Sequence, residues 1–160
     1  MAVMKLKELR KNIKPGTRLL GLDLGSKTVG LALSDVTLMI ASPLETIKCT
    51  KFTADAQNLE LLIDAHDVGG LVLGLPVSMD GSEGPRCQST RSFASNLLAR
   101  RNIALSFWDE RLSTAAVERV LICQADMTRK RRAEVVDKAA AAYILQGALD
   151  AMAMARSHPP

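Results

Sequence analysis

The chain has 160 residues, of which 48% are hydrophobic and 24% are charged. This composition supports one hydrophobic core and leaves too little chain for two full domains, so we expect a single domain. Aromatic residues make up only 3% of the chain. That scarcity disfavours RNA-recognition sheets, OB-folds and other modules that stack bases on an aromatic platform.

The formal net charge of +4 is concentrated at the N-terminus. Residues 1–18 carry six basic side chains and one acidic one, a net charge of +5, so residues 19–160 carry −1. The overall charge therefore permits a polyanionic partner without requiring one. We expect a basic, mobile lead over residues 1–16, one domain over residues 17–156 and a loose tail over residues 157–160.

The cysteine pattern indicates a reducing compartment. Cys49, Cys87 and Cys123 lie far apart and include no CxxC pair, so neither a disulfide framework nor a zinc site is expected. The N-terminal segment has no apolar region typical of a signal peptide. No apolar run reaches the roughly 18 residues that a membrane span needs. These features predict a soluble cytoplasmic protein.

The first half of the chain predicts three strands. Two apolar runs, residues 18–23 and 29–34, are separated by the turn-prone segment Gly25-Ser-Lys-Thr28 and predict a hairpin. Residues 43–49 alternate between apolar and polar positions, which favours a third strand with one solvated face. Together these strands would form an antiparallel meander.

The middle of the chain alternates between helical and strand patterns. Residues 55–66 have apolar positions at spacings of three and four, which indicates an amphipathic helix. Residues 68–75 are almost continuously apolar, as in a strand of a parallel sheet. A polar, Gly/Pro-rich loop follows over residues 76–85, then a helix that begins at proline and runs over residues 85–101. Residues 103–108 predict the fifth strand.

Two helical segments complete the prediction, over residues 113–123 and about 134–155. The inward side of the last helix is predicted to contain Val136, Ala139, Ala140, Tyr143, Ile144, Gly147 and Ala151. The order of elements is β-β-β-α-β-α-β-α-α. It predicts an α/β fold with a mixed five-stranded sheet flanked by helices.

Acidic residues stand where this topology would form a site. Asp23 closes the first strand, Asp109 and Glu110 close the fifth, and Asp137 lies in the first turn of the last helix. Because sites in open α/β sheets form at the carboxyl ends of strands, we expect Asp23 and Glu110 at this edge. Asp137 would join them if the last helix begins beside it. Carboxylates without histidine or cysteine pairs favour Mg²⁺ or Mn²⁺, and two such ions could support phosphodiester cleavage.

Each acid has an alternative explanation when taken alone. Asp23 could serve turn chemistry at a strand end, and Asp137 could stabilise a helix N-terminus. Arg111 could pair with either Asp109 or Glu110, and we prefer Glu110 as the metal ligand, with Asp109 less favoured. Only the combination of acids indicates a metal site.

Basic residues beside the acids could contact phosphates. Four consecutive basic residues precede Asp137 and one follows it, although a solvated charged loop is the alternative. The loop over residues 76–85 could likewise contact a phosphate or form an ordinary surface loop. We assign no catalytic role to His66 or His158. The side chains expected to bind nucleic acid are Lys27, Arg111, Arg129, Lys130, Arg131, Arg132 and Lys138.

Five ordered blocks of sequence carry a resemblance to one family. They are Gly21–Gly30 with Ala32–Asp35; Ala41–Ile47; Gly74–Pro76 with Met79–Gly81 and Glu83–Pro85; Trp108–Thr114; and Val136–Ala141 with Ile144–Gln146. Over about residues 17–152 the chain resembles the YqgF/RuvX family of bacterial proteins. The resemblance implies an RNase H-like three-layer fold. It also implies a nuclease that matures the 5′ end of pre-16S rRNA, or a Holliday junction resolvase.

The acidic site of that family falls on Asp23, Glu110 and Asp137, the residues that the strand-end argument also favours. Val77 and Ser78 replace the more usual Leu-Asn, and Ser113 stands where threonine is frequent. These departures leave the acidic set intact and affect at most the loops.

Three functions follow from these expectations. The first is a two-metal-ion endonuclease without a covalent enzyme intermediate. The fold does not decide between structured RNA and four-way DNA, and the resemblance implies ribosomal RNA maturation more than junction cleavage. The second is an ATPase, because residues 23–28 are similar to the first phosphate loop of actin and Hsp70, although that fold needs two domains. The third is an RNA-binding protein without catalysis. Cleavage of junctions would require a homodimer, whereas RNA trimming is open to a monomer.

Overall fold

The computed structural model describes residues 3–25, 27–77, 80–110 and 129–157, and for residues 129–137 and 155–157 it describes the backbone alone. The strands are β1 (Arg18–Leu24), β2 (Thr28–Ser34), β3 (Ala41–Lys48), β4 (Val68–Leu75) and β5 (Ala104–Asp109). The helices are α1 (Leu6–Asn12), α2 (Phe52–Ala65), α3 (Pro85–Arg100) and α5 (Arg129–Ser157). Within this part of the chain, every helix is too short or too polar to cross a membrane.

The five strands form one mixed sheet in the order β3-β2-β1-β4-β5. Strand β2 is antiparallel to both β1 and β3, whereas β4 is parallel to both β1 and β5. The predicted meander and mixed sheet are therefore confirmed. The parallel strands β1, β4 and β5 end together at Leu24, Leu75 and Asp109, and we call this side of the sheet the carboxyl edge.

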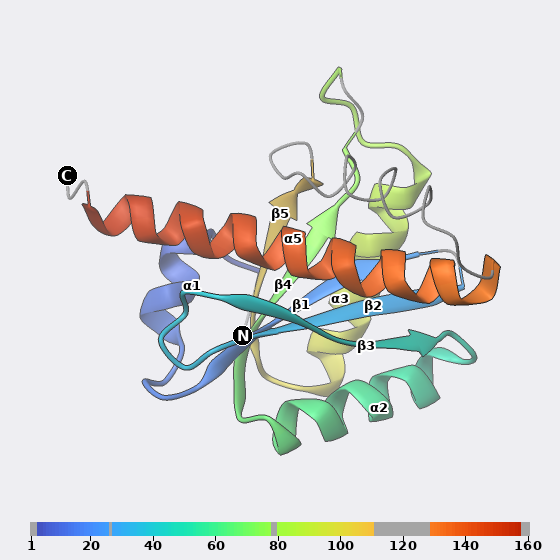
Figure 1. The fold of residues 1–160 in the computed structure, drawn as a ribbon, viewed down its shortest axis with the longest axis horizontal. Coiled ribbons are helices and arrows are strands. Elements are labelled where there is room, and N and C mark those ends of the chain that lie inside the picture. Colours follow the sequence, from blue (N-terminus) through green and yellow to red (C-terminus); the bar gives the residue numbers. More distant parts are fainter. Residues whose placement is uncertain (1–2, 26, 78–79, 111–128, 158–160) are drawn as a thin grey trace.

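Helices cover both faces of the sheet, which gives the expected three layers (Figure 1). Helix α5 lies across one face, and α2 and α3 pack on the other. The alternation along β1 shows why both faces are buried. Leu19 joins the core beneath α5, whereas Leu20 and Leu22 join the core beneath α2 and α3. A central strand of this kind needs apolar residues on both faces.

Helix α5 packs closely on β1 because Gly21 has no side chain. A Cβ built on Gly21 would lie 2.8 Å from the Leu145 Cβ and 3.2 Å from the Ala141 carbonyl oxygen. The buried residues of α5 are Ala140, Ala141, Ile144, Leu145, Ala148, Leu149 and Met152. Small residues on both elements therefore let the helix backbone approach the sheet.

The inward side predicted for this helix is partly right. Ala140 and Ile144 are buried, whereas Ala139, Tyr143, Gly147 and Ala151 are only half-buried. The buried stripe is shifted towards the residues that follow each predicted position. The helix also begins earlier than the predicted residue 134, at Arg129. The side chain of Val136 and the predicted helix over residues 113–123 lie outside the described residues.

The N-terminal segment, expected to be a loose lead, is folded onto the domain. Its apolar residues Leu6, Leu9 and Ile13 recur at spacings of three and four, and α1 turns them towards the core beneath α5. Leu9 is completely buried. The Met4 amide donates a hydrogen bond to the Leu105 carbonyl oxygen at 2.9 Å, so the segment also pairs with the exposed side of β5. The apolar residues of this segment alternate with the basic ones, so the charge pattern alone does not predict the helix.

The turn between β2 and β3 is organised by Asp35. Its carboxylate accepts hydrogen bonds from the Thr37 hydroxyl and from the Ile40 and Met39 amides, the latter two at 3.1 Å and 2.8 Å. These bonds favour the charged form and lower the pKa of Asp35 to about 2. The charged carboxylate of Asp35 therefore stabilises this turn through its hydrogen bonds.

If α1 belongs to the domain, Leu9→Ala will destabilise the whole fold. We expect the free energy of unfolding to fall by about 2–5 kcal/mol, because a fully buried leucine is replaced by a cavity. Urea unfolding followed by circular dichroism measures the change. Leu61→Ala is the matched control, because Leu61 is 68% exposed and should change stability by no more than about 0.5 kcal/mol. Equal, small effects of both substitutions would contradict the packing of α1.

Candidate active site at the carboxyl edge of the sheet

Asp23 is the most buried acidic residue at the carboxyl edge. It is the penultimate residue of β1 and is only 4% exposed. Because strand side chains alternate, Asp23 shares the α5 face of the sheet with Gly21, two residues earlier. Burial of a carboxylate in a largely apolar layer costs free energy unless hydrogen bonds or cations compensate it. Its position is therefore that of a functional group more than of a solvated strand end.

Glu110 reaches the same face through a gap left by a glycine. Leu22 pairs with Leu73, so Asp23 and Gly74 come next on adjacent parallel strands, about 4.8 Å apart. A Cβ built on Gly74 would lie 2.8 Å from Glu110 Oε1 and 3.2 Å from Glu110 Cγ. The Glu110 side chain therefore lies over β4, and Asp23 and Glu110 share one corner of the sheet.

Asp109, the less favoured ligand, belongs to the opposite face. Trp108 lies in the core beneath α5, so the alternation of β5 turns the next residue, Asp109, towards α2 and α3. Asp109 and Glu110 thus lie on different faces of the sheet, and the preference for Glu110 as a ligand stays a prediction.

Asp137 lies on α5, and the contacts of that helix indicate where its turn runs. Gln146 accepts a hydrogen bond from the Ala41 amide at 2.9 Å and donates one to the Met39 carbonyl oxygen at 2.9 Å, at the start of β3. One turn earlier, Ala141 lies over Gly21 in the middle of β1. The N-terminal part of α5, to which Asp137 belongs, lies towards the end of the sheet where β3 finishes (Figure 1).

The side chain of Asp137 lies outside the described residues. Among the side chains that are described, no three histidine, cysteine, aspartate or glutamate residues come together as a metal site. Asp23 and Glu110 are two carboxylates at this corner, and the predicted metal site would need a third ligand. The backbone position of Asp137 makes it the candidate for the third.

The predicted nucleic-acid contacts are placed only in part. Lys27 is exposed in the turn between β1 and β2, at the carboxyl edge. Lys138 is half-buried on α5. Residues 129–132 form the beginning of α5, and only their backbone is described. Arg111 lies outside the described residues. The role of these basic residues therefore stays a prediction.

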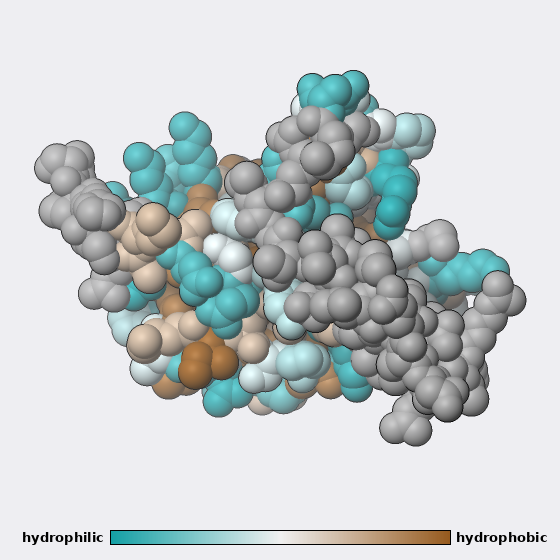
Figure 2. Space-filling model, turned by 45° about the horizontal axis from the view of Figure 1, so that its top comes forward, coloured by the Kyte–Doolittle hydropathy of each residue, from teal (hydrophilic) through white to brown (hydrophobic). Residues whose placement is uncertain are grey.

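The loop between β4 and α3 extends beyond the carboxyl edge. Figure 2 shows the hydrophilic tip that the described residues of this loop form. Glu83 accepts two hydrogen bonds from Arg91, at 2.7 and 2.9 Å, and these lower the pKa of Glu83. The loop is thus tied back to α3 by an ion pair.

Sequence reasoning missed Arg86, in the first turn of α3. Its guanidinium donates a hydrogen bond to the Leu24 carbonyl oxygen at 3.3 Å, next to Asp23. The first turn of α3 contains no acidic residue. A cation there opposes the helix macrodipole, and this unusual placement is the sequence signal that could have identified it.

Cys87 is poorly suited to be a nucleophile. The residue is completely buried. Burial raises the pKa of its thiol, and the carboxylates of Glu83 and Glu110 act in the same direction.

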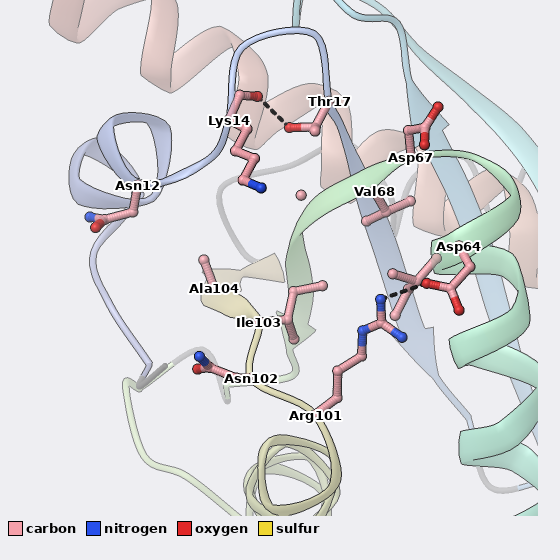
Figure 3. Close-up of a pocket in the computed structure, with 12 residues that line it drawn as sticks. Asn12, Lys14, Thr17, Asp64, Asp67, Val68, Arg101, Asn102, Ile103 and Ala104 are labelled. Carbon is pink, nitrogen blue, oxygen red and sulfur yellow. Dashed lines mark hydrogen bonds and ion pairs between the residues drawn. The ribbon is translucent and has the colours of Figure 1, made fainter.

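A separate cavity of about 510 Å³ lies at the opposite edge of the sheet, where β1, β4 and β5 begin. Figure 3 shows Lys14 pointing into it, while Arg101 turns to Asp64, with which it forms an ion pair of 2.6 Å. Asp64 and Asp67 balance the two basic residues of the lining. Because sites in open α/β sheets form at carboxyl ends, this cavity is not our candidate.

Solved structures share this architecture. The structure described as RuvC from T. thermophilus in complex with a Holliday junction substrate superposes with a TM-score of 0.53 at 11% identity, covering 84% of this chain and 94% of that chain. The yeast mitochondrial Holliday junction resolvase Ydc2 gives a TM-score of 0.52 at 12% identity, covering 96% and 86%. At such low identity the likeness concerns the fold alone. The fold is that of the RNase H-like resolvases, as expected.

Sequence comparison identifies the family within this class. The family model described as "RuvX: Holliday junction resolvase" matches residues 17–151. A protein of Rhodospirillum rubrum named "Putative pre-16S rRNA nuclease" is 62% identical over 152 residues, covering 95% of this chain and 94% of that protein. A protein of Paramagnetospirillum magneticum with the same name is 63% identical over 150 residues, covering 94% and 96%. The chain belongs to the RuvX family.

The space at Gly74 predicts a specific effect of adding one methyl group. In Gly74→Ala the new Cβ would meet Glu110 Oε1 at 2.8 Å and Ile144 Cδ1 at 2.5 Å, both at the ends of flexible side chains. We expect the protein to fold with a loss of about 1–2 kcal/mol and to bind Mn²⁺ about tenfold more weakly, because Glu110 is displaced. Calorimetric Mn²⁺ titration measures the affinity.

Gly84→Ala is the control, because a Cβ there would have no atom within 4 Å. A folded Gly74→Ala variant with the Mn²⁺ affinity of the wild type would show that Glu110 is not a ligand.

Proposed function

We propose that this protein is a divalent-metal-dependent endonuclease that processes the 5′ end of pre-16S rRNA. The observation that carries the proposal is the placement of Asp23 and Glu110 on one face at the carboxyl edge, with Gly74 opening the space between them. The names of relatives at about 60% identity support the choice of substrate.

The residues at this corner suit hard divalent cations. Asp23 and Glu110 offer carboxylate oxygens, the ligands that Mg²⁺ and Mn²⁺ prefer, and Asp137 would complete the set. Bound there, one or two such ions would activate a water molecule for attack on phosphorus and stabilise the leaving oxygen. Their charge would also offset the mutual repulsion of neighbouring carboxylates.

The chain itself contributes rigid positioning. Asp23 lies on β1, which is hydrogen-bonded between β2 and β4, so the strand cannot shift without breaking the sheet. Glu110 directly follows β5. The third carboxylate would come from α5, which packs on β1 through Gly21. Ligands on three packed elements favour a site whose geometry is set before the substrate binds.

Electrostatics must also bring a polyanion towards these acids. We assign this task to basic residues around the carboxyl edge, among them Lys27 in the β1–β2 turn and the four-residue basic run over residues 129–132. Contacts to phosphates position a nucleic acid without reading its sequence. Structured RNA would therefore be recognised mainly by its shape and backbone.

Cleavage of four-way DNA is the second candidate function, and the description of the matching family model favours it. A junction resolvase makes two symmetry-related cuts, so it requires a dimer with two sites. RNA trimming needs one site. Cleavage of junctions is therefore possible only for a dimer, whereas RNA trimming is possible for a monomer.

Substitution of the carboxylates tests the proposed reaction. We expect Asp23→Asn and Glu110→Gln each to slow cleavage of a 5′-extended 16S precursor about a hundredfold or more, because a charged ligand is lost. Gel assays with Mg²⁺ or Mn²⁺, and with a chelator in parallel, measure the rates. Asp109→Asn is the matched control, because Asp109 faces the other side of the sheet, and its rate should stay within about threefold.

The substrates separate the alternatives. Cleavage of a four-way junction but not of the precursor would favour the resolvase function. Binding of the precursor without any metal-dependent cleavage would favour an RNA-binding protein. Unchanged cleavage by folded Asp23→Asn and Glu110→Gln would contradict the assigned site.

A further inference from the structure

A second cavity, of about 390 Å³, adjoins the carboxyl edge on the face opposite Asp23. It lies between the first turns of α2 and α3, and Leu24 and Gly25 at the end of β1 form part of its wall. Leu24 directly follows Asp23 in the chain. The cavity and the carboxylates are thus separated by the end of a single strand.

Two of the three phenylalanines of this chain line the cavity. Phe52 at the start of α2 and Phe93 in α3 pack edge to face, with their ring centroids 5.5 Å apart and an angle of 84° between the rings. Both are only half-buried. In a chain so poor in aromatic residues, this pair places two of the side chains that can stack on a base in one cavity. Stacking on an aromatic ring is possible for any base.

Polar atoms on the wall could read the edge of a base. Asp55 is 6% exposed and Thr90 is 2% exposed. The Asp55 carboxylate accepts bonds of 3.2 and 3.3 Å from the Thr50 amide and one of 3.3 Å from the Thr50 hydroxyl. The Thr90 hydroxyl donates to the Arg86 carbonyl oxygen at 3.0 Å. A carboxylate and a hydroxyl each retain acceptor capacity beyond these bonds. Ring N–H and amino groups of a base are suitable donors.

Arg86 supplies a cation at the mouth of the cavity. Its guanidinium uses one terminal nitrogen for the Leu24 carbonyl oxygen, and a guanidinium has five N–H donors. The residue is exposed. A phosphate at Arg86 and a base between the helices would belong to the same nucleotide. A cavity of this volume is suited to a small ligand and not to a duplex.

We propose that this cavity receives the base of one unpaired nucleotide of the substrate strand, next to the phosphodiester that is cleaved at the carboxyl edge. This inference rests on the proposed nuclease function and adds a requirement to it. The strand must be open at one nucleotide beside the cut. Phe52 and Phe93 hold the base, and Arg86 holds its phosphate.

Abasic substitution of the substrate tests the proposal. A set of 5′-extended precursors would each carry one abasic nucleotide within three positions of the cut. For the wild type we expect one position to weaken binding about fivefold or more, with little change in kcat, because base stacking is lost there. Phe93→Leu should weaken binding of the intact precursor and remove the effect of the abasic nucleotide at that position. Dissociation constants are measured by fluorescence anisotropy with Ca²⁺, and KM and kcat with Mg²⁺.

Phe107→Leu is the matched control. Phe107 is the third phenylalanine and lies outside this cavity, beneath the Arg91 guanidinium at 5.0 Å, so its substitution should leave the abasic profile as in the wild type. Thermal unfolding shows whether each variant is folded, and Phe52→Leu replaces Phe93→Leu if the latter is not.

Two outcomes would overturn the proposal. One is an abasic profile without a distinct position, and the other is a distinct position that persists in the folded phenylalanine variant, Phe93→Leu or its replacement Phe52→Leu. Inhibition by AMP, combined with a flat abasic profile, would assign the cavity to a free nucleotide instead. The dissociation constants can be measured even if the precursor is not cut. Failure of the nuclease function and failure of the base site are therefore distinguishable.

Discussion

The close packing of α5 on the sheet is the contact on which the candidate site depends. Gly21 and Gly74 leave out the two side chains that would hold the helix and Glu110 away from β1 and β4. The first glycine lets the helix that carries Asp137 lie directly on β1. The second opens a space beside Asp23. A side chain at either position would push α5 or Glu110 away from the sheet, so the proposed site depends on two absent methyl groups.

Much of the fold could be predicted because burial follows the periodicity of the sequence. Strand β4 has the predicted bounds, Val68–Leu75, since a strand buried on both faces is continuously apolar. The ends of α5 were harder, because its charged first turns carry no apolar pattern. For the N-terminal residues, the prediction relied on charge and overlooked an apolar pattern. Their charge suggested a loose lead, but Leu9 and its apolar neighbours at helical spacing bury one face of α1.

The candidate site could be predicted as far as chain topology determines it. Asp23 lies near the end of β1 and Glu110 directly follows β5, and both strands end at the same edge, so the strand order alone places both residues there. Gly74 and Arg86 were missed because their importance arises from contacts between elements distant in sequence. The phenylalanines give the same lesson: their number disfavours a stacking platform, yet two of them meet in one cavity because the first residue of α2 contacts the middle of α3. Composition limits how many such sites exist, but not where they lie.

The central claim is that Asp23, Glu110 and Asp137 form one divalent-cation site at the carboxyl edge. A crystal structure of the protein soaked in Mn²⁺, with anomalous scattering recorded to locate the ion, tests it most directly. We expect Mn²⁺ at the end of β1, with oxygen atoms of all three carboxylates at bonding distance, about 2.0–2.6 Å for hard cations of this kind. Mn²⁺ bound elsewhere, or held at this edge without Asp23 and Asp137, would contradict it.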